Sequence, residues 1–286
     1  MTTAAAPIAP VRLAGGGLAS DGRAIRVVWR RELLRFFRNR LRLVASLAQP
    51  VLFLFVLGTG LSALIPSSSG VNFRTFMFPG ILAMTVLFTA LFSAISIVWD
   101  REFGFLREML VAPVRRGAIV VGKSAGGATT AVIQGVVMLA FAGVVGVPYS
   151  PTLFLVLLGE MALLAFALTA FGVLLASRMT KIESFQAVMQ FLVMPMFFLS
   201  GAMFPVTGVP AWLAVLTRLD PLAYAVDPMR RVVFSHVTAP AQLSHRLNPG
   251  MTWAGWHLPI ALELGLVAAG AVAALVLAIW QFSKTE

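Results

Sequence analysis

The chain alternates long apolar runs with short charged segments. The apolar runs fall at about 43–65, 75–98, 124–147, 152–176, 185–204 and 259–281. An α-helix needs about 20 apolar residues to cross the hydrocarbon layer of a bilayer, and each run is close to that length. The pattern therefore predicts an all-α integral membrane protein with six transmembrane helices.

Composition supports this class and excludes others. Of the 286 residues, 59% are hydrophobic and 12% are charged, about half the charged share of a typical soluble domain. There is no cysteine, so disulfides, thiolate nucleophiles and cysteine metal sites are excluded. The net charge is +11, but the basic residues stand in short blocks beside apolar runs. That arrangement is typical of membrane topology and not of nucleic-acid binding.

The basic residues also predict the orientation. With the N-terminus inside, seventeen of the 22 Lys and Arg residues fall on the cytoplasmic side, and four of the other five lie in one long segment after the fifth run. Positive charge is enriched in cytoplasmic loops. We expect a multi-pass protein of the cell (inner) membrane with both termini in the cytoplasm.

The segment before the first run divides into two parts. Residues 1–21 are expected to form a disordered cytoplasmic tail. Residues 22–42 have the pattern of an amphipathic helix, with arginines largely opposite an apolar face. Two interpretations stay open: a connecting helix in the plane of the lipid headgroups, or a plain basic cluster. Residues 43–286 are expected to form a single transmembrane domain.

The charged stretch 99–123 lies between the second and third runs. Apolar residues from Phe103 to Leu110 recur at three- and four-residue spacings, which predicts a short amphipathic helix that Pro113 ends. A helix at the membrane edge is a docking element for a soluble partner. The residues expected to make this contact are Arg101, Glu102, Phe105, Leu106, Arg107, Glu108 and Met109.

One segment of this stretch matches a nucleotide-binding motif in letters but not in context. Residues 117–124, GAIVVGKS, fit the G-x-x-x-x-G-K-[ST] pattern of a phosphate-binding loop. Three β-branched residues occupy the middle of the match, and a membrane span, not a strand-loop-helix unit, surrounds it. We therefore expect no nucleotide here, and we expect Lys123 to extend to the headgroups at the inner face.

Acidic and histidine residues offer few further sites. Glu160 lies within the fourth run, where we expect a buried polar contact more than a proton relay. Glu263 lies near the outer end of the sixth run, where a place at the interface would need no further explanation. The three histidines match no metal-ligand spacing. No catalytic set converges, so the chain is expected to be no enzyme and to bind no metal or cofactor itself.

The fifth run is rich in methionine and phenylalanine. Flexible thioethers and aromatic rings suit a surface that accepts varied apolar ligands. The alternative is ordinary packing against lipid or a second subunit. The residues predicted to line a substrate path are Met194, Phe197, Phe198, Met203 and Phe204.

Two stretches together resemble ABC-2 exporter permeases of the drug-resistance and nodulation type. The first is WDREFGFLREMLVAPVRRGAIVVGK, residues 99–123. The second is FLSGAMFPVTGVPAWLAVLTRLDPLAYAVDPMRRVV, residues 198–233, in which the matching residues are Phe198, Ser200, Gly201, Phe204, Pro205, Pro210, Trp212, Leu213, Asp220, Pro221, Leu222, Tyr224 and Arg230. Asp220 stands where the family often has Asn.

The resemblance implies an architecture and partners. It implies a coupling helix at 101–112, short re-entrant outer helices after the fifth span, a dimer of permeases and two copies of a separate ATPase subunit that binds ATP and Mg. Homodimer and heterodimer both stay open. The implied function is export of an amphipathic drug or lipid-like substrate, with multidrug efflux and antibiotic resistance as the setting. The alternatives are export of a lipid-linked glycan or polysaccharide, and a standalone secondary carrier. A carrier needs polar residues along several spans, which the sequence hardly offers.

Overall fold

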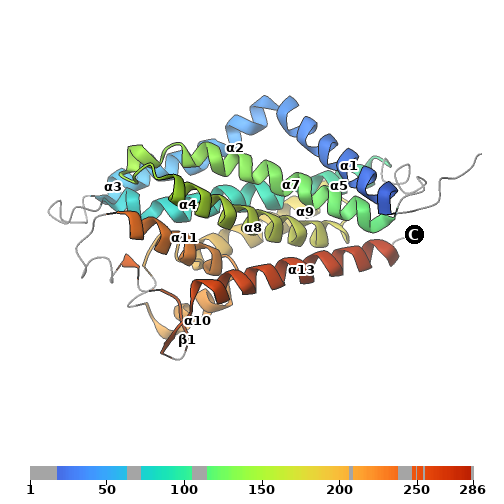
Figure 1. Cartoon of the computed structure of the whole chain (residues 1–286). Coiled ribbons are helices and arrows are strands. Elements are labelled where there is room, and N and C mark those ends of the chain that lie inside the picture. Colours follow the sequence, from blue (N-terminus) through green and yellow to red (C-terminus); the bar gives the residue numbers. More distant parts are fainter. Residues whose placement is uncertain are drawn as a thin grey trace, which may run out of the picture.

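Figure 1 shows a bundle of long helices that lie side by side. The computed structural model describes residues 18–62, 72–104, 115–205, 209–237, 247–248, 250–253 and 255–284. The helices are α1 (Leu18–Arg38), α2 (Arg40–Leu52), α3 (Gly58–Ser62), α4 (Phe73–Ser93), α5 (Ile95–Glu102), α7 (Arg116–Leu139), α8 (Pro151–Ala176), α9 (Ile182–Leu199), α10 (Ala211–Leu219), α11 (Ala223–His236) and α13 (Ile260–Lys284). A π-helical turn, Phe53–Leu57, joins α2 to α3, and a 3₁₀ turn, Ala142–Val145, follows α7.

Five helical stretches are long and apolar enough to cross a membrane. They are Leu43–Ser62, Phe73–Glu102, Pro151–Ala176, Ile182–Leu199 and Ile260–Lys284. The prediction of a helical membrane protein is thereby confirmed. The small strands β1 (Thr252–Trp253) and β2 (Trp256–His257), which pair antiparallel, are an exception to the all-α expectation.

The predicted boundaries of the third span are wrong. The sequence pattern placed it at 124–147, whereas α7 begins at Arg116 and ends at Leu139. Its first turns include the buried Lys123, which has carboxylate partners inside the protein. After Leu139 the chain turns through Ala142–Val145 to Gly146, whose φ of 82° favours glycine.

Helix α1 packs along α7. Its Val28 is buried and its Trp29 indole N–H donates to Thr129 on α7 at 3.0 Å. The approach is close because α7 carries glycines there: a Cβ at Gly126 would lie 2.7 Å from the Glu32 Cβ. The helix begins at Leu18, four residues before the predicted start, and Asn39 interrupts the helix between α1 and α2. The predicted apolar face is only partly buried at Trp29, Leu33 and Phe36 and is exposed at Phe37, so a place in the headgroup plane stays a prediction.

Helix α4 occupies the centre of the bundle. Nearly all of its side chains from Thr75 to Leu91 are buried, and it contacts α7, α8, α9 and α11. A Cβ at Gly80 would lie 2.6 Å from Ala202, so the chain that follows α9 also presses against α4. By contrast the spans that contain α2, α9 and α13 bury less than a third of their residues inside the bundle. These outer helices have the surfaces that would meet lipid or another subunit.

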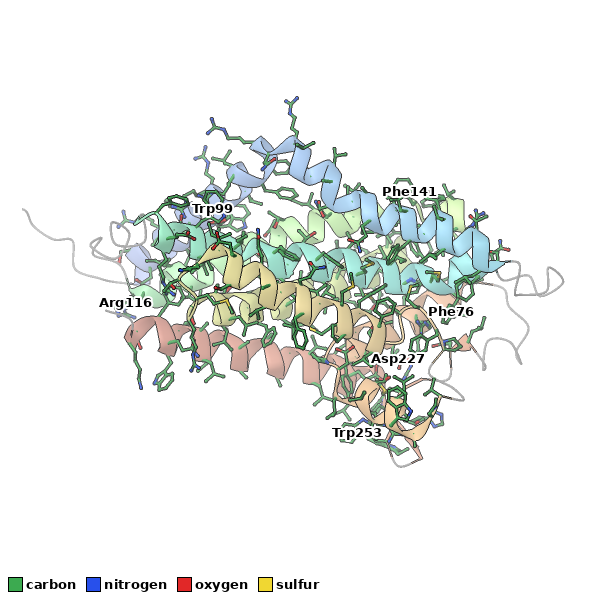
Figure 2. All side chains as sticks on the ribbon, turned by 180° about the vertical axis from the view of Figure 1, so that it is seen from behind. Phe76, Trp99, Arg116, Phe141, Asp227 and Trp253 are labelled. Carbon is green, nitrogen blue, oxygen red and sulfur yellow. The ribbon has the colours of Figure 1, made fainter. Side chains whose placement is uncertain are left out.

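The shorter elements gather at one end of the bundle. Figure 2 shows Asp227 and Trp253 at this end, and Trp99 and Arg116 at the opposite end. Among these shorter elements α10, Ala211–Leu219, is a short helix that follows the fifth predicted span. The fifth span, expected at 185–204, ends earlier, because α9 stops at Leu199 and Gly201 adopts a φ of 72°.

Candidate functional site

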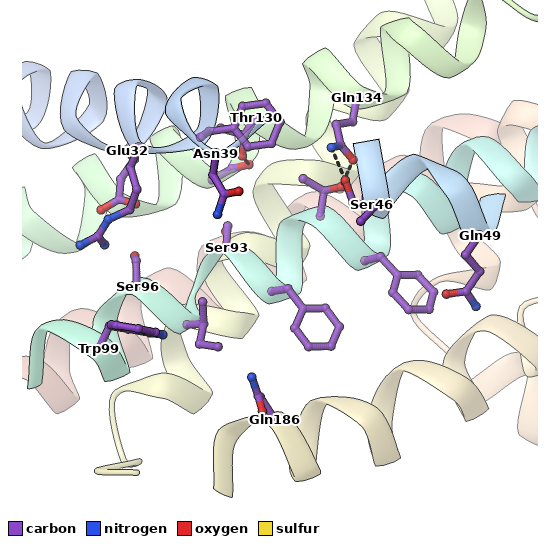
Figure 3. Close-up of a pocket in the computed structure, with 18 residues that line it drawn as sticks. Glu32, Asn39, Ser46, Gln49, Ser93, Ser96, Trp99, Thr130, Gln134 and Gln186 are labelled. Atoms are coloured by element: carbon purple, nitrogen blue, oxygen red, sulfur yellow. Dashed lines mark hydrogen bonds between the residues drawn. The ribbon is translucent and has the colours of Figure 1, made fainter. Parts of the chain in front are cut away.

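A cavity of about 670 Å³ opens among six helices near the α1–α2 break (Figure 3). Residues from α1, α2, α4, α5, α7 and α9 line it. The lining consists of Glu32, Arg35, Phe36, Asn39, Ala45, Ser46, Gln49, Phe88, Thr89, Phe92, Ser93, Ile95, Ser96, Trp99, Gly127, Thr130, Gln134 and Gln186. A volume of this size is within the range of small-molecule sites.

Most of the polar lining carries no formal charge. Gln134 on α7 is its most connected member: its Oε1 accepts from the Thr89 hydroxyl at 2.6 Å, and its Nε2 donates to the Ser46 hydroxyl (Figure 3). On the opposite side Gln186 of α9 faces the cavity. Phe88 and Phe92 of α4 add stacked aromatic rings. The cavity can therefore offer hydrogen bonds and ring faces to one ligand.

A cluster of buried charges closes one end of the cavity. The Lys123 ammonium donates to Asp100 at 2.7 Å, to Glu32 at 3.1 Å and to the Ser96 hydroxyl at 3.1 Å. The Arg31 guanidinium reaches the same Asp100 carboxylate at 2.6 Å. The prediction that Lys123 extends to the headgroups is wrong, since its side chain is buried. A buried ammonium is tolerated only with such partners.

The next two residues of α5 bind a different pair of elements. The Arg101 guanidinium donates to the Met179 carbonyl at 2.8 Å and to the Ala176 carbonyl at 3.5 Å, at the C-terminus of α8. The Glu102 carboxylate accepts from the Ile182 N–H at 2.9 Å, at the N-terminus of α9. Both contacts place a charge where a helix end favours it.

The end of α5 is thus a junction. Asp100 joins α5 to α1 and α7, Arg101 joins it to α8, and Glu102 joins it to α9. One turn earlier, Ile95, Ser96 and Trp99 of the same helix line the cavity. A displacement of α5 would therefore move the cavity wall and strain its contacts with four other helices.

The sequence was then compared with known proteins. Residues 23–234 match the family described as ABC-2 type transporter. The chain belongs to the ABC-2 type transporter family. It is therefore a multi-pass membrane protein of a family of transport permeases, as its stretches at 99–123 and 198–233 predicted.

Named relatives of this ABC-2 chain differ in their descriptions. A putative transport permease, ycf38, of Cyanophora paradoxa is 31% identical over 215 residues, 73% of each chain. Nodulation protein J of Rhizobium leguminosarum bv. trifolii is 31% identical over 215 residues, 73% of this chain and 80% of its own. A probable multidrug ABC transporter permease, YbhR, of Escherichia coli K12 is 29% identical over 164 residues, 56% of this chain and 44% of its own.

The structure of this ABC-2 chain describes part of the predicted coupling segment. Arg101 and Glu102 are bound at the junction, while Phe105, Leu106, Arg107, Glu108 and Met109 lie outside the described residues. The two described residues already have partners within the chain, so part of their role is to tie α5 to α8 and α9. Contact with an ATPase stays a prediction for all seven.

The predicted substrate-path residues do not line the cavity. Phe197 is buried and its ring centroid lies 6.1 Å from that of Phe53 on the π-helical turn, whereas Phe198 is half exposed. Met194, Met203 and Phe204 are partly buried. From α9 only Gln186 reaches the cavity. A path along the other face of α9 stays a prediction.

The polar cavity itself was missed. Its uncharged polar residues come from α2, α4, α5, α7 and α9, one or a few from each, so none of these spans reads as polar by itself. The expectation that the spans offer almost no polar lining is therefore wrong. A helical phase analysis that marked Ser93, Gly127, Thr130 and Gln134 as facing inward would have been the available signal.

The two acidic residues of the spans have different environments. Glu160 of α8 is buried, and its Oε2 has no hydrogen-bond partner among the residues that the structure describes. Glu263 of α13 is fully buried and accepts from Arg231 at 2.8 Å, so it has a specific partner inside the protein, while its place at the membrane interface stays a prediction. Among the described residues no group of acidic and histidine side chains could hold a metal ion. His245 lies outside them.

Proposed function

We propose that the chain is the membrane subunit of an ATP-driven exporter. It moves an amphipathic drug or lipid-like substrate out of the cytoplasm or the inner leaflet of the cell membrane. Two copies of a separate ABC ATPase bind ATP and Mg and drive it, and a second copy of this chain completes a homodimer. Both termini lie in the cytoplasm. The catalytic chemistry belongs to the partner, which agrees with a chain for which we identify no catalytic set.

The junction at the end of α5 supports this function. Asp100, Arg101 and Glu102 directly precede the segment that the family resemblance assigns to ATPase docking. A push on that segment would reach α1 and α7 through Asp100, and α8 and α9 through the next two residues. The same helix forms a wall of the cavity. This arrangement converts a displacement outside the membrane into a change of cavity shape.

The cavity lining also favours a second substrate class. Amide and hydroxyl groups beside Phe88, Phe92 and Trp99 suit sugar rings, which use hydrogen bonds along their edges and stack on aromatic faces. A lipid-linked glycan is therefore the alternative substrate. The named relatives include both a probable multidrug permease and nodulation protein J, so the family name leaves this choice open.

The test of the coupling role uses Glu102→Lys in proteoliposomes with the cognate ATPase. The variant loses the bond to the Ile182 N–H and places a positive charge at a helix N-terminus. We expect ATP hydrolysis to persist while efflux of a fluorescent amphipathic drug falls by about tenfold, because transmission through the junction is broken. Glu183→Lys, at the exposed acid next to Ile182 in the first turn of α9, makes the same charge change without removing the Glu102 bond, so it is the matched control and should retain efflux. Unchanged efflux in Glu102→Lys would count against the proposal.

The test of the cavity uses Ser93→Trp, which fills it from α4. We expect this variant to block transport and to abolish stimulation of ATP hydrolysis by substrate. Val136→Trp, at an exposed position on α7, adds the same side chain outside the cavity and should transport normally. Stimulation by an amphipathic drug supports the first substrate class, and stimulation by a glycolipid supports the second. Normal transport by Ser93→Trp would show that the substrate does not use this cavity.

A further inference from the structure

A second cavity lies at the other end of the bundle, away from the junction. It encloses about 310 Å³, at the lower limit for ligand sites. Its wall is formed by the residue after α9, by α10 and α11, and by the β1–β2 hairpin, with Ser200, Ala214, Arg218, Ala223, Asp227, Arg230, Gly250, Met251, Thr252 and His257 as its lining. Its size suits a headgroup more than a whole drug molecule.

Arg230 is the unusual member of this lining. Its side chain is 2% exposed, so a full positive charge is buried. Among the described residues its guanidinium donates to the Gly201 carbonyl and lies 4.4 Å above the Phe76 ring, while its Nε has no partner. Burial lowers its pKa to about 10, so it remains charged at neutral pH. A guanidinium has five N–H donors, and among the described residues the Nε–H of Arg230 is one that has no acceptor.

Asp227, the carboxylate in the cavity, favours the charged form of Arg230 but forms its direct ion pair with Arg231. Asp227 Oδ2 accepts from the Met251 N–H at 2.9 Å and from Arg231. Arg231 in turn donates to Glu263 and to the Leu258 carbonyl, both at 2.8 Å. Asp227 is therefore already paired with a third arginine. No ion pair of Arg218 is found among the described residues. Arg218 and Arg230 thus line the cavity without a direct ion pair among the described residues.

The surroundings indicate where in the membrane this cavity lies. Trp212 of α10, Trp253 of β1 and Trp256 of β2 are all about half exposed or more. The Trp253 indole N–H donates at 3.1 Å to the Tyr224 hydroxyl, which donates at 2.7 Å to the Arg218 carbonyl. Exposed indole rings of membrane proteins gather at the level of the lipid headgroups. The cavity therefore lies where phosphate groups are concentrated.

We propose that this cavity binds a phosphate group of the kind that lipid headgroups carry, with the Arg218 and Arg230 guanidiniums as its cationic partners. Guanidinium groups bind phosphate through paired, charge-assisted hydrogen bonds. The Thr252 hydroxyl and the His257 ring are further polar groups along the wall, whereas the Ser200 hydroxyl already donates to the Phe197 carbonyl. The proposal is independent of the transported substrate, because it concerns the end of the bundle opposite the junction.

The experiment measures thermal unfolding of the full chain in a neutral detergent while a ligand is added. The ligands are dihexanoyl phosphatidylglycerol, inorganic phosphate and, as a phosphate-free control, dihexanoylglycerol. We expect phosphatidylglycerol to raise the Tm of the wild type and dihexanoylglycerol to leave it unchanged. If inorganic phosphate raises the Tm as much as phosphatidylglycerol does, the ligand is a free anion. If phosphatidylglycerol raises the Tm and inorganic phosphate does not, the ligand is the lipid headgroup.

Variants locate the effect. Arg218→Gln should weaken phosphatidylglycerol binding by about tenfold or more, since a charge-assisted hydrogen bond is lost. Arg74→Gln removes a charge near the start of α4, outside the cavity lining, and should bind like the wild type. Arg230→Lys keeps the charge but loses the planar fork, and should also weaken binding. The proposal is overturned if phosphate ligands leave the wild-type Tm unchanged, or if Arg218→Gln responds as the wild type does.

Discussion

Individual charged residues in this chain are bound by specific partners. Asp100, Arg101 and Glu102 contact three different sets of elements, although they are consecutive. Arg116 at the start of α7 donates to the Phe282 carbonyl at 3.0 Å, at the C-terminus of α13. Basic residues at this end thus satisfy carbonyls at helix ends as well as setting orientation.

Replacing the buried lysine tests the charge cluster. In Lys123→Met the Asp100 and Glu32 carboxylates lose their shared ammonium, and both stay largely buried. We expect the free energy of unfolding to fall by about 3 kcal/mol, as when one partner of a buried ion pair is removed. Denaturant unfolding in detergent measures it. Lys284→Met, at an exposed site, is the control, and an equal effect of the two changes would contradict the assignment.

Asp220 gives a pH-dependent prediction. Burial raises the pKa of this carboxyl to about 7, although the Leu222 N–H bond lowers it. The folded state therefore holds the proton more tightly than the unfolded state, whose pKa is near 3.8. The contribution of Asp220 to the free energy of unfolding is fully present below about pH 3.8 and is lost as the pH rises to about 7. Above that pH the cost of burying the ionised carboxylate stays constant.

The variant Asp220→Asn removes this titration. We expect its Tm to exceed that of the wild type at pH 8, and the difference to shrink as the pH falls towards 5. The difference at pH 8 should correspond to on the order of 1 kcal/mol or more. Arg218 and Tyr224 stand near this carboxyl, so each sample is also compared with a Tyr224→Phe background. A difference in Tm that does not change with pH would contradict the raised pKa.

At the scale of elements, glycines decide how closely helices approach. A Cβ at Gly126 of α7 would lie 2.7 Å from the Glu32 Cβ on α1, while a Cβ at Gly270 of α13 would meet nothing within 4 Å. Both glycines are inside helices, so they form a matched pair. Alanine is a better helix former than glycine by up to about 1 kcal/mol.

The paired substitutions should have opposite effects on the free energy of unfolding. We expect Gly270→Ala to raise the Tm modestly and Gly126→Ala to lower it, by about 1–3 kcal/mol in unfolding free energy, because the added methyl group overpacks the α1–α7 contact. Unfolding in the same detergent measures both. Since Glu32 also binds Lys123, Gly126→Ala should reduce efflux too. A stabilising Gly126→Ala would show that α1 is free to move away from α7.

Some elements of this protein can be predicted from its sequence and others cannot. The apolar runs at 152–176 and 259–281 correspond closely to α8 and α13, and Pro151 occupies the first turn of α8, where proline is favoured. The burial of Lys123 was not predicted because its partner Glu32 is 91 residues away. The cavity was missed for the same reason: Ser46, Thr89 and Gln134 meet only after three helices have packed. The local pattern of apolar residues predicts helices, but it does not predict which polar residues of different helices come into contact.

At the scale of the whole molecule the two ends of the bundle differ in chemistry. One end has the α5 junction, where basic residues bind carboxylates and helix-end carbonyls. The other has two guanidiniums without a described ion pair, while exposed indoles are found at both ends. The exporter function requires the junction to face the cytoplasm, where an ATPase can reach the segment that follows Glu102. The orientation is therefore the property on which the proposed mechanism depends most.

The absence of cysteine makes this orientation directly measurable. Single cysteines are placed at Phe103, which is 58% exposed at the end of α5, and at Trp256, which is 59% exposed in the hairpin. In intact cells we expect a membrane-impermeant maleimide to label Trp256→Cys and not Phe103→Cys, because the charged stretch at 99–123 faces inward. Inside-out vesicles should give the reverse pattern, and a permeant maleimide should label both variants in either preparation. Labelling of Phe103→Cys from outside would place the junction beyond the reach of ATP, and the exporter proposal would then fail together with the orientation.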